Sequence, residues 1–462
     1  MLEKRTLVNQ AIDKIDQKVI LYGWVNSVRD HGKLVFIDFR DRSGLIQVVG
    51  GQNLFGGIKN ESVLTIEGIV KKRPDHLINN NIATGTIEVE AEKVTVLAKA
   101  KDLPFDIYGT GIKINDDLRL RYRYLDLRRP RLRRNLAFRH QLMQAVRQSL
   151  SARGFWEIDT PNLSKSTPEG ARDFLVPSRL HRGKFYALPQ SPQQYKQLLM
   201  VAGIEKYFQI ATCFRDEDLR ADRGLEFKQI DIEMSFVDRD DLLRIMEEVI
   251  IEVIEKLGRK ISKKPFPRIA YQEAQKKYNS DKPDLRKNKQ DPEELAFTWI
   301  VDFPLFEKTQ EREINPMHHP FTSPNLDDLD KLATEPLLVR SWQYDLVLNG
   351  QEIAGGSIRI TDPKIQEQVF KVLGHSDKEI KNRFGHLLEA FSYGVPPHGG
   401  IAFGFDRLTA ILAGENSIRE VIAFPVNASG RTAVMEAPSL VGKDQLKELA
   451  IEVVDEQSGE TA

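Results

Sequence analysis

The chain has little of what marks a secreted or membrane protein. It holds a single cysteine among 462 residues, which excludes an internal disulfide and a zinc site built from cysteines. Its start, MLEKRTLVNQ, lacks an apolar signal core, and no run approaches the length of a membrane span. These absences predict a reducing, cytoplasmic setting with no membrane association.

An excess of one charge is also missing, because Lys plus Arg and Asp plus Glu each number 67, for a formal net charge of +0. This balance excludes a basic or acidic character of the whole chain. It leaves room for local basic surfaces that bind nucleic acid. The length predicts two or more domains and a sizeable core.

What is present begins with alternating apolar and polar residues between positions 18 and 97. Such alternation predicts strands, and turn residues separate five of them, at 19–28, 34–41, 44–49, 62–71 and 86–97. This spacing favours a small barrel of the oligonucleotide-binding (OB) kind. Phe36 is then either a platform on which a base stacks or a cap of the barrel core. Arg29 and Gln47 favour RNA, because arginine can hold a phosphate and glutamine can bond a base edge.

Residues 119–134 contain eight arginines and a single acid, Asp126, interleaved with apolar residues. We predict a hinge at 106–134 that docks between two domains and meets phosphates. An amphipathic helix at 135–152 and a strand at 155–163 are expected to follow. The polar, proline-bearing stretch 262–296 is predicted to be a linker with weak helix.

The hairpin predicted at 207–236 carries the densest set of polar side chains. One face of its two arms holds Gln209, Ala211, Cys213, Arg215, Glu217, Phe227, Gln229, Asp231 and Glu233. Burying such a mixture is costly without a ligand, because unpaired charges in a core cost several kcal/mol each. A solvated sheet face is the simpler alternative.

A second hairpin is predicted at 340–361, with its turn at Asn349-Gly350. It places Asp345 and Glu352 on facing strands, where two carboxylates repel unless a cation lies between them. Strict alternation sends Glu352 and Arg359 to opposite faces. A bulge at Gly355-Gly356 would restore a common face.

Two further stretches carry ligand-binding residue types. The adjacent His318 and His319 should point to opposite sides of an extended chain, and no third histidine or cysteine nearby supports a metal site. A glycine-rich strand at 395–404 runs into a helix whose first turn holds Arg407. Glycines let a nucleotide approach the backbone, and a helix start favours anions.

A helix beginning near residue 192 should place Gln193 and Lys196 one turn apart. Ser191 is expected to cap this helix, with Pro192 at its first position. The Gly/Pro-containing loop that carries Glu169 is predicted to be a mobile lid over a substrate.

Three motifs in order resemble the class II aminoacyl-tRNA synthetases of the subgroup that charges Asp, Asn and Lys. The helix and strand at 135–163 resemble motif 1, CFRDEDLRADR with Phe227 resembles motif 2, and GIAFGFDRL resembles motif 3. TPEGARDF, QSPQQYK, MHHPF and GGSIRI are nearly identical to bacterial members that charge aspartate. The resemblance covers nearly the whole chain.

The resemblance implies an α+β fold, with an OB-fold anticodon-binding domain at 1–105, the hinge at 106–134 and a class II catalytic domain at 135–462. In the catalytic domain, helices flank an antiparallel sheet, and a short stub at about 284–296 replaces the usual insertion domain. The implied function is a ligase that activates L-aspartate with ATP and Mg²⁺ and charges tRNA-Asp, as a homodimer. The alternative is a paralogue that binds RNA, or adenylates aspartate, without charging tRNA.

The resemblance also implies roles for individual residues. Catalysis would involve Arg215, Glu217 and Arg407. ATP would be bound by Arg215, Glu217, Phe227, Glu352, Gly404, Phe405, Asp406 and Arg407, and Mg²⁺ by Asp345 and Glu352. Aspartate would be bound by Glu169, Ser191, Gln193, Lys196, Arg215, Gln229, Asp231, His318, His319 and Arg359. The anticodon would be contacted by Arg29, His31, Phe36, Gln47 and Asn81.

Some positions bear on specificity or depart from the family. The cations Lys196 and Arg359 suit an aspartate carboxylate better than an asparagine amide. Gly224 stands where a glutamine that touches ATP is common, and Val426 replaces a usual lysine. His31 resembles relatives that also charge tRNA-Asn, whereas Asn81 resembles those that do not, so charging of tRNA-Asn stays open.

Overall fold

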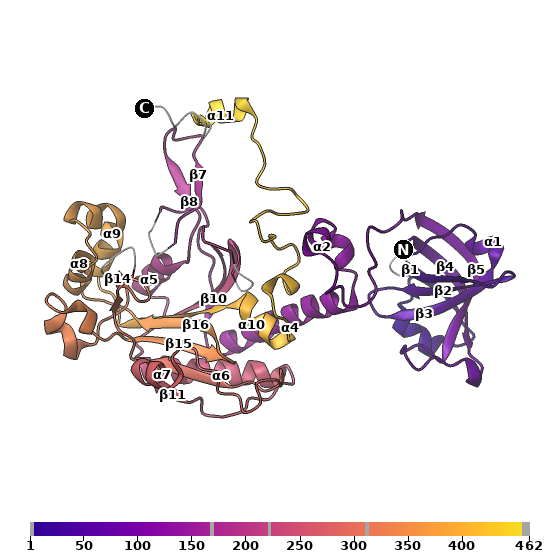
Figure 1. Cartoon of the computed structure of the whole chain (residues 1–462), viewed down its shortest axis with the longest axis horizontal. Helices are drawn as coiled ribbons and strands as arrows, with labels where there is room; N and C mark the ends of the chain where they lie inside the picture. Colours follow the sequence, from indigo (N-terminus) through magenta and orange to yellow (C-terminus); the bar gives the residue numbers. More distant parts are fainter. Residues whose placement is uncertain (1–3, 167–170, 220–222, 310–313, 455–462) are drawn as a thin grey trace. The chain divides into compact units, whose positions relative to one another are not determined.

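The computed structural model describes residues 4–166, 171–219, 223–309 and 314–454 (Figure 1). The chain forms two compact units, Met1–Asp106 and Ile107–Ala462. Among the helices in these described ranges, none combines the length and the apolar composition that crossing a bilayer requires.

The first unit is a closed five-stranded barrel with strand order β1-β2-β3-β5-β4. Its elements are η2 (Val8–Lys14), β1 (Lys18–Asp30), β2 (Leu34–Arg40), β3 (Leu45–Gly51), α1 (Gln52–Phe55), β4 (Val63–Lys72), η3 (Asp75–Leu77) and β5 (Ile87–Ala98). The five predicted strands are confirmed. Alternation along β2 buries Val35, Ile37 and Phe39 in the barrel, so Phe36 lies on the outer face and does not cap the core.

The second unit is built on an eight-stranded sheet with order β11-β12-β15-β16-β17-β10-β9-β6. Its strands are β6 (Trp156–Glu157), β9 (Lys206–Phe214), β10 (Glu226–Ser235), β11 (Arg268–Ala270), β12 (Phe297–Val301), β15 (Gln343–Leu348), β16 (Gln351–Ile358) and β17 (His398–Gly404). The six strands from β12 to β9 pair antiparallel, as predicted, whereas the edge strands β11 and β6 pair parallel to their neighbours.

Helices and short strands surround this sheet. The helices are α2 (Asp116–Arg121), α3 (Arg123–Asp126), α4 (Pro130–Ala152), α5 (Gln193–Val201), α6 (Arg239–Lys256), α7 (Tyr271–Tyr278), α8 (Pro363–Val372), α9 (Asp377–Ser392), α10 (Phe405–Ala413) and α11 (Lys443–Leu449). The remaining elements are β7 (Leu175–Pro177), β8 (Phe185–Ala187), β13 (Phe306–Glu307), β14 (Asn315–Pro316), η4 (Leu326–Lys331), η5 (Pro336–Leu338) and η6 (Ile418–Glu420).

The core lies between one face of the sheet and the helices α4 and α6. Leu142 and Leu150 from α4 and Leu242 and Met246 from α6 pack with sheet residues such as Trp299, and each is fully buried. Figure 1 shows α6 running alongside β15 and β16. Because strand side chains alternate, the polar residues of the same strands face the other way, away from these helices.

Residues 262–296 are not a linker, contrary to the prediction. Strand β11 joins the main sheet beside β12, and α7 follows it directly. Ile269 and Ala274 are buried in a cluster with Ile300 and Phe303. The polar composition of this stretch hides the few apolar residues that anchor it.

Two element boundaries were also predicted wrongly. Helix α4 begins at Pro130, five residues earlier than expected, because a proline fits the first turn of a helix, where its missing N–H costs nothing. The strand expected over 155–163 is limited to Trp156 and Glu157, which pair with β9.

Three of the eight hinge arginines are buried and therefore unavailable to phosphates. Arg119, Arg123 and Arg129 are buried and surround Asp126, with donor–acceptor distances of 3.1, 3.1 and 2.6 Å to its carboxylate. Burial alone would raise the pKa of Asp126, but the hydrogen bonds and charges of these arginines lower it. The prediction of a phosphate-binding stretch is therefore wrong for these three residues.

Candidate active site

A cavity of about 290 Å³ is bordered by both hairpins, by the start of α5 and α10, and by the histidine pair. The predicted site residues that line it are Ser191, Gln193, Lys196, Arg215, Glu217, Phe227, Gln229, Asp231, His318, His319, Glu352, Arg359, Gly404, Asp406 and Arg407. Residues from distant parts of the chain thus share one cavity.

Two of the residues predicted for this site do not line the cavity, and a third lies outside the described residues. Phe405 is fully buried in the core beneath α10, so its side chain does not line the cavity. Asp345 is also absent from the lining and lies behind Gly355. Glu169 lies outside the described residues, as does the rest of the middle of the predicted lid, 167–170.

The two arms of the first hairpin present their polar residues on one face, as predicted. Cys213 pairs with Phe227, Ala211 with Gln229, and Gln209 with Asp231, so the polar residues of both arms share one face. Asp231 is fully buried, which excludes the alternative of a solvated sheet face.

At the deep end of the cavity, two cations and two carboxylates form a network in which their charges neutralise one another. Lys196 Nζ lies 3.0 Å from Asp231 Oδ2 and 3.2 Å from Glu233 Oε2. Arg359 donates from Nε and Nη2 to the two oxygens of Glu233 at 2.9 and 3.0 Å. Burial would raise the pKa of Glu233, but the charges of Arg359 and Lys196 outweigh it and lower that pKa to about 2. The sequence predicts no role for Glu233, although its position on the polar face of β10 is a signal for one.

One acceptor in this network has no donor within the described part of the chain. Asp231 Oδ1 is buried, and no described side chain or backbone group donates to it. Burial raises the pKa of Asp231, against the opposing charge of Lys196. An ammonium group from a ligand would supply the missing donor and stabilise the carboxylate.

The histidines were expected on opposite sides of the chain, and this is wrong. The rings of His318 and His319 lie side by side with centroids 4.3 Å apart, and both line the cavity. The chain is not extended here, because Phe321 N turns back to donate to His319 Nδ1 at 3.2 Å. Burial, Arg359 and Lys196 lower the pKa of His318 to about 3, so this ring is neutral at physiological pH.

The helix start at α5 differs by one residue from the prediction. Pro192 is the capping residue and Gln193 the first helical one. Ser191 still contributes, because its hydroxyl accepts from Gln193 N at 3.3 Å. Lys196 is one turn further along the helix and reaches β10 as described above.

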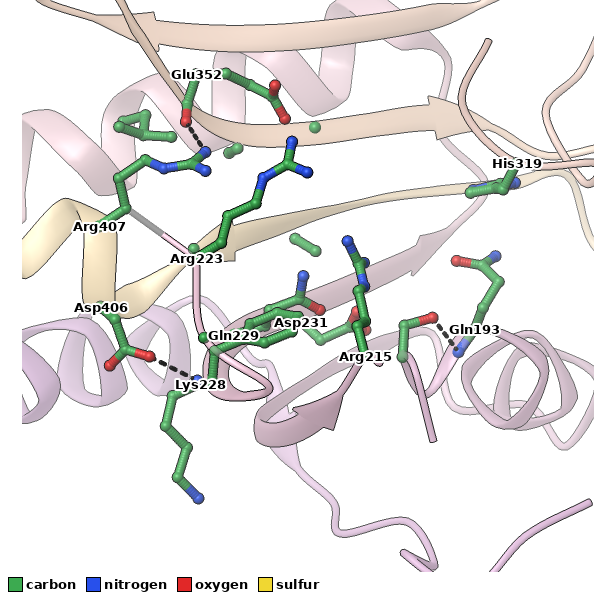
Figure 2. Close-up of a pocket in the computed structure, with 18 of the residues that line it drawn as sticks. Gln193, Arg215, Arg223, Lys228, Gln229, Asp231, His319, Glu352, Asp406 and Arg407 are labelled. Carbon is green, nitrogen blue, oxygen red and sulfur yellow. Dashed lines mark hydrogen bonds between the residues drawn. The ribbon is translucent and has the colours of Figure 1, made fainter. Parts of the chain in front are cut away.

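Three further guanidinium groups line the cavity, those of Arg215, Arg223 and Arg407. Arg215 lies over the ring of Phe227, with its Cζ 5.2 Å from the ring centroid. Arg407 on α10 donates to the backbone oxygen of Glu352 (Figure 2). Arg223, which had no predicted role, also lines the cavity, 3.5 Å from Glu217. Arginine side chains grouped in this way suit the oxygens of a phosphate chain.

Asp406 holds α10 in place through two contacts. Its Oδ2 accepts from Lys228 N at 2.9 Å, and its Oδ1 lies 2.5 Å from Arg139 Nη1. The hydrogen bond joins α10 to β10, and the ion pair joins α10 to α4. They fix Arg407, the next residue, beside the cavity.

The second hairpin turns at Asn349-Gly350 as predicted, with φ angles of 54° and 81°. A bulge is present, but not at Gly355-Gly356. Leu346 pairs with Ala354 and Val347 with Glu352, so Ile353 is the extra residue. The added residue changes the alternation, and Glu352 and Arg359 both line the cavity.

The carboxylates of Asp345 and Glu352 converge at Gly355. A Cβ atom added there would lie 3.1 Å from Asp345 Oδ1 and 3.8 Å from Glu352 Oε1. Burial and the charge of Glu352 raise the pKa of Asp345 well above its usual range. The described residues hold no cluster of three or more His, Cys, Asp or Glu side chains suited to a metal. Two carboxylates nevertheless fit Mg²⁺, which often takes one or two protein oxygens together with substrate phosphates.

Three of the barrel's candidate residues, Arg29, Phe36 and Gln47, lie on the outer face of β1, β2 and β3. Arg29 is held by Asp38 at 2.9 Å and by Gln47 at 3.2 Å. Phe36 contacts the His31 ring edge to face, with centroids 5.5 Å apart. Asn81 is exposed in the turn between β4 and β5.

Comparison with known proteins defines the class. Residues 115–428 match the family model for class II tRNA synthetases (D, K and N), and residues 19–97 match that for the OB-fold nucleic acid binding domain. The chain belongs to the class II tRNA synthetases of the D, K and N group.

Within that group, the chain is 42% identical to the aspartate–tRNA(Asp/Asn) ligase of Syntrophomonas wolfei, covering 96% of this chain and 98% of that protein. It is also 42% identical to the ligase of the same name from Heliobacterium modesticaldum, covering 96% and 94%. The first alignment spans 573 positions and this chain has 462 residues, so at least 111 positions have no counterpart here. The loss of an insertion domain near residues 284–296 stays a prediction.

Solved structures show the same fold. The aspartyl-tRNA synthetase of Entamoeba histolytica aligns with a TM-score of 0.73 at 22% identity, covering 91% of both chains. The asparaginyl-tRNA synthetase of Pyrococcus horikoshii, solved with asparaginyl-adenylate, gives 0.73 at 22% identity, covering 91% of this chain and 98% of that one.

Proposed function

We propose that the protein is an aspartate–tRNA ligase, which activates L-aspartate with ATP and transfers it to tRNA-Asp. The observation that carries this proposal is one cavity lined by two chemically different sets of cations. Arg215, Arg223 and Arg407 suit a triphosphate, whereas Lys196 and Arg359 suit an acidic amino acid. The names of the relatives at 42% identity support the same function.

In the first step, an oxygen of the aspartate α-carboxylate attacks the α-phosphorus of ATP. The bond from that phosphorus to the bridging oxygen breaks, giving aspartyl-adenylate and pyrophosphate. Arg215 and Arg407 hold the phosphate oxygens and stabilise the charge that develops on them. Phe227 offers its ring to the adenine. Mg²⁺, held by Asp345 and Glu352, would supply further charge neutralisation.

In the second step, a hydroxyl of the terminal ribose of the tRNA attacks the aspartyl carbonyl carbon. The bond from that carbon to the phosphate oxygen breaks, and AMP leaves with the hydroxyl proton on a phosphate oxygen. No protein side chain is needed as a general base in this scheme. The chain's contribution is to position both reactants and to stabilise charge.

Selection of the amino acid takes place at the deep end. Asp231 Oδ1, which lacks a donor among the described residues, accepts from the ammonium of aspartate. When aspartate binds, Lys196 and Arg359 donate some of their hydrogen bonds to its side-chain carboxylate in place of Asp231 and Glu233. An asparagine amide presents N–H donors to these cations and is disfavoured.

RNA is proposed to bind the barrel face that carries Arg29, Phe36 and Gln47. A second copy of the chain is proposed to cover the edge of the sheet at β6. The exposed side chains there, Trp156 at 63% and Leu163 at 52%, favour a partner.

The test is aspartate-dependent exchange of pyrophosphate into ATP, followed by charging of purified tRNA-Asp and tRNA-Asn. We expect exchange with aspartate and at least tenfold weaker exchange with asparagine, which would rise in Arg359→Gln. Absence of exchange would contradict the proposal. Exchange without charging of either tRNA would instead identify an aspartate-adenylating paralogue. Charging of tRNA-Asn decides the question left open by His31 and Asn81.

A further inference from the structure

Lys282 lies beside the carboxylate pair, and none of the roles above uses it. It follows α7, where its backbone N–H donates to Ser280 Oγ at 3.0 Å. Its ammonium Nζ is 3.4 Å from Glu352 Oε2. A positive charge therefore stands where the two carboxylates would otherwise repel each other.

The segment that carries Lys282 is fastened to the turn of the second hairpin. Asn349 Nδ2 donates to the backbone oxygen of Glu294 at 2.9 Å, and Ala296 N donates to Asn349 Oδ1 at 2.9 Å. Asp284 packs against Gly350, where an added Cβ would come within 3.2 Å of Asp284 Cβ. The segment and the strands that carry both carboxylates are thus held together.

The ion pair itself is easily broken. The Lys282 and Glu352 side chains are 40% and 36% exposed, and pairs in such surroundings contribute little to stability. Lysine has a flexible stem and a compact charge, so it can withdraw when another cation arrives. Mg²⁺ would use the same carboxylate oxygens and would be repelled by the ammonium.

We propose that Lys282 is a built-in counter-cation of the Asp345–Glu352 pair that competes with Mg²⁺ for it. This inference rests on the proposed function, because it assumes that the pair holds the metal of the nucleotide. In the enzyme without nucleotide, Lys282 weakens metal binding. When ATP is bound, its phosphates add ligands and negative charge, and the metal displaces Lys282 from Glu352.

The test is titration of the full-length protein with Mn²⁺ in the absence of nucleotide, followed by electron paramagnetic resonance. Lys282→Gln is expected to bind Mn²⁺ about tenfold more tightly, because one repelling charge is removed. Lys282→Arg keeps the charge, and Lys276→Gln removes an exposed charge from the neighbouring α7. Both controls should stay within about twofold of the unmodified protein.

Mn²⁺ affinity that is unchanged or weaker in Lys282→Gln would overturn the inference, as would absence of binding in every variant. A weaker ATP affinity with unchanged Mn²⁺ affinity would assign Lys282 to the phosphates instead. Pyrophosphate exchange is measured separately, and it fails only if the proposed function is wrong. With exchange present, the Mg²⁺ concentration for half-maximal rate should fall in Lys282→Gln.

Discussion

Two groups of arginines in the second unit contrast in their partners. Around Asp126, Arg119, Arg123 and Arg129 are at most 3% exposed and bind carboxylates and backbone oxygens. In the cavity, Arg215 lies over an aromatic ring and Arg223 meets Glu217 only at 3.5 Å. The comparison teaches that partners, and not the density of arginines along the chain, distinguish structural from ligand-binding guanidinium groups.

Arg215→Gln should distinguish the ligand-binding arginines from the structural ones most clearly. We expect the rate of pyrophosphate exchange to fall about 10³-fold, roughly 4 kcal/mol of transition-state stabilisation, because a guanidinium on the α-phosphate is lost. Urea denaturation should show nearly unchanged stability. Arg121→Gln, an exposed change on α2, is the control and should alter neither quantity. An exchange rate within tenfold of that of the unmodified enzyme would contradict the role proposed for Arg215.

Asp126→Ala should instead lower the stability and leave the rate of pyrophosphate exchange nearly unchanged. Three buried guanidinium groups lose their shared carboxylate, and the free energy of unfolding should fall by about 3 kcal/mol. Exchange activity per folded molecule should stay near normal at low temperature. If Asp126→Ala is as stable as the unmodified protein, other partners compensate for the lost carboxylate. The arginines around Asp126 would then not be structural in the sense proposed.

Glu233→Gln probes the deep end, where cations are paired yet close to the proposed substrate. Loss of the charged acceptor for Arg359 should cost about 2 kcal/mol of stability at neutral pH. The pKa of Glu233 is depressed from 4.5 to about 2, so its stabilisation is complete above pH 4.5 and is lost as the pH falls toward 2. The stability difference between the two proteins should shrink over that range in urea titrations. A difference that does not change with pH would contradict the assigned pKa, and Glu273→Gln on α7 serves as the control.

The smallest effect is expected on the barrel. Phe36→Ala should raise the KM for tRNA about tenfold, because stacking of a base on an aromatic ring contributes roughly 1–3 kcal/mol. Exchange in the absence of tRNA should be unchanged, since Phe36 belongs to the first unit and the cavity to the second. An unaltered KM would contradict the proposed contact between RNA and β2.

Local patterns predicted the elements, and long-range pairing explains the failures. The five barrel strands and both hairpins followed from alternation and turn residues. The partner of Arg119, Glu420, lies 301 residues away, so no local pattern could show that this arginine is buried. The position of the bulge at Ile353 depends on how β15 and β16 pair, which the two glycines suggested incorrectly. Glu233 was visible on the correct face, but only its contacts with Lys196 and Arg359 reveal its importance.

The extra residue at Ile353 makes β16 intolerant of changes in length. Removing one residue between Glu352 and Arg359 would rotate one of these side chains toward α4 and α6, and adding one would do the same. Substitutions along this strand can be gradual in their effects, whereas a single-codon deletion should abolish nucleotide and amino-acid binding together. Natural variation in this family should therefore change the loops around β16 in length far more readily than β16 itself.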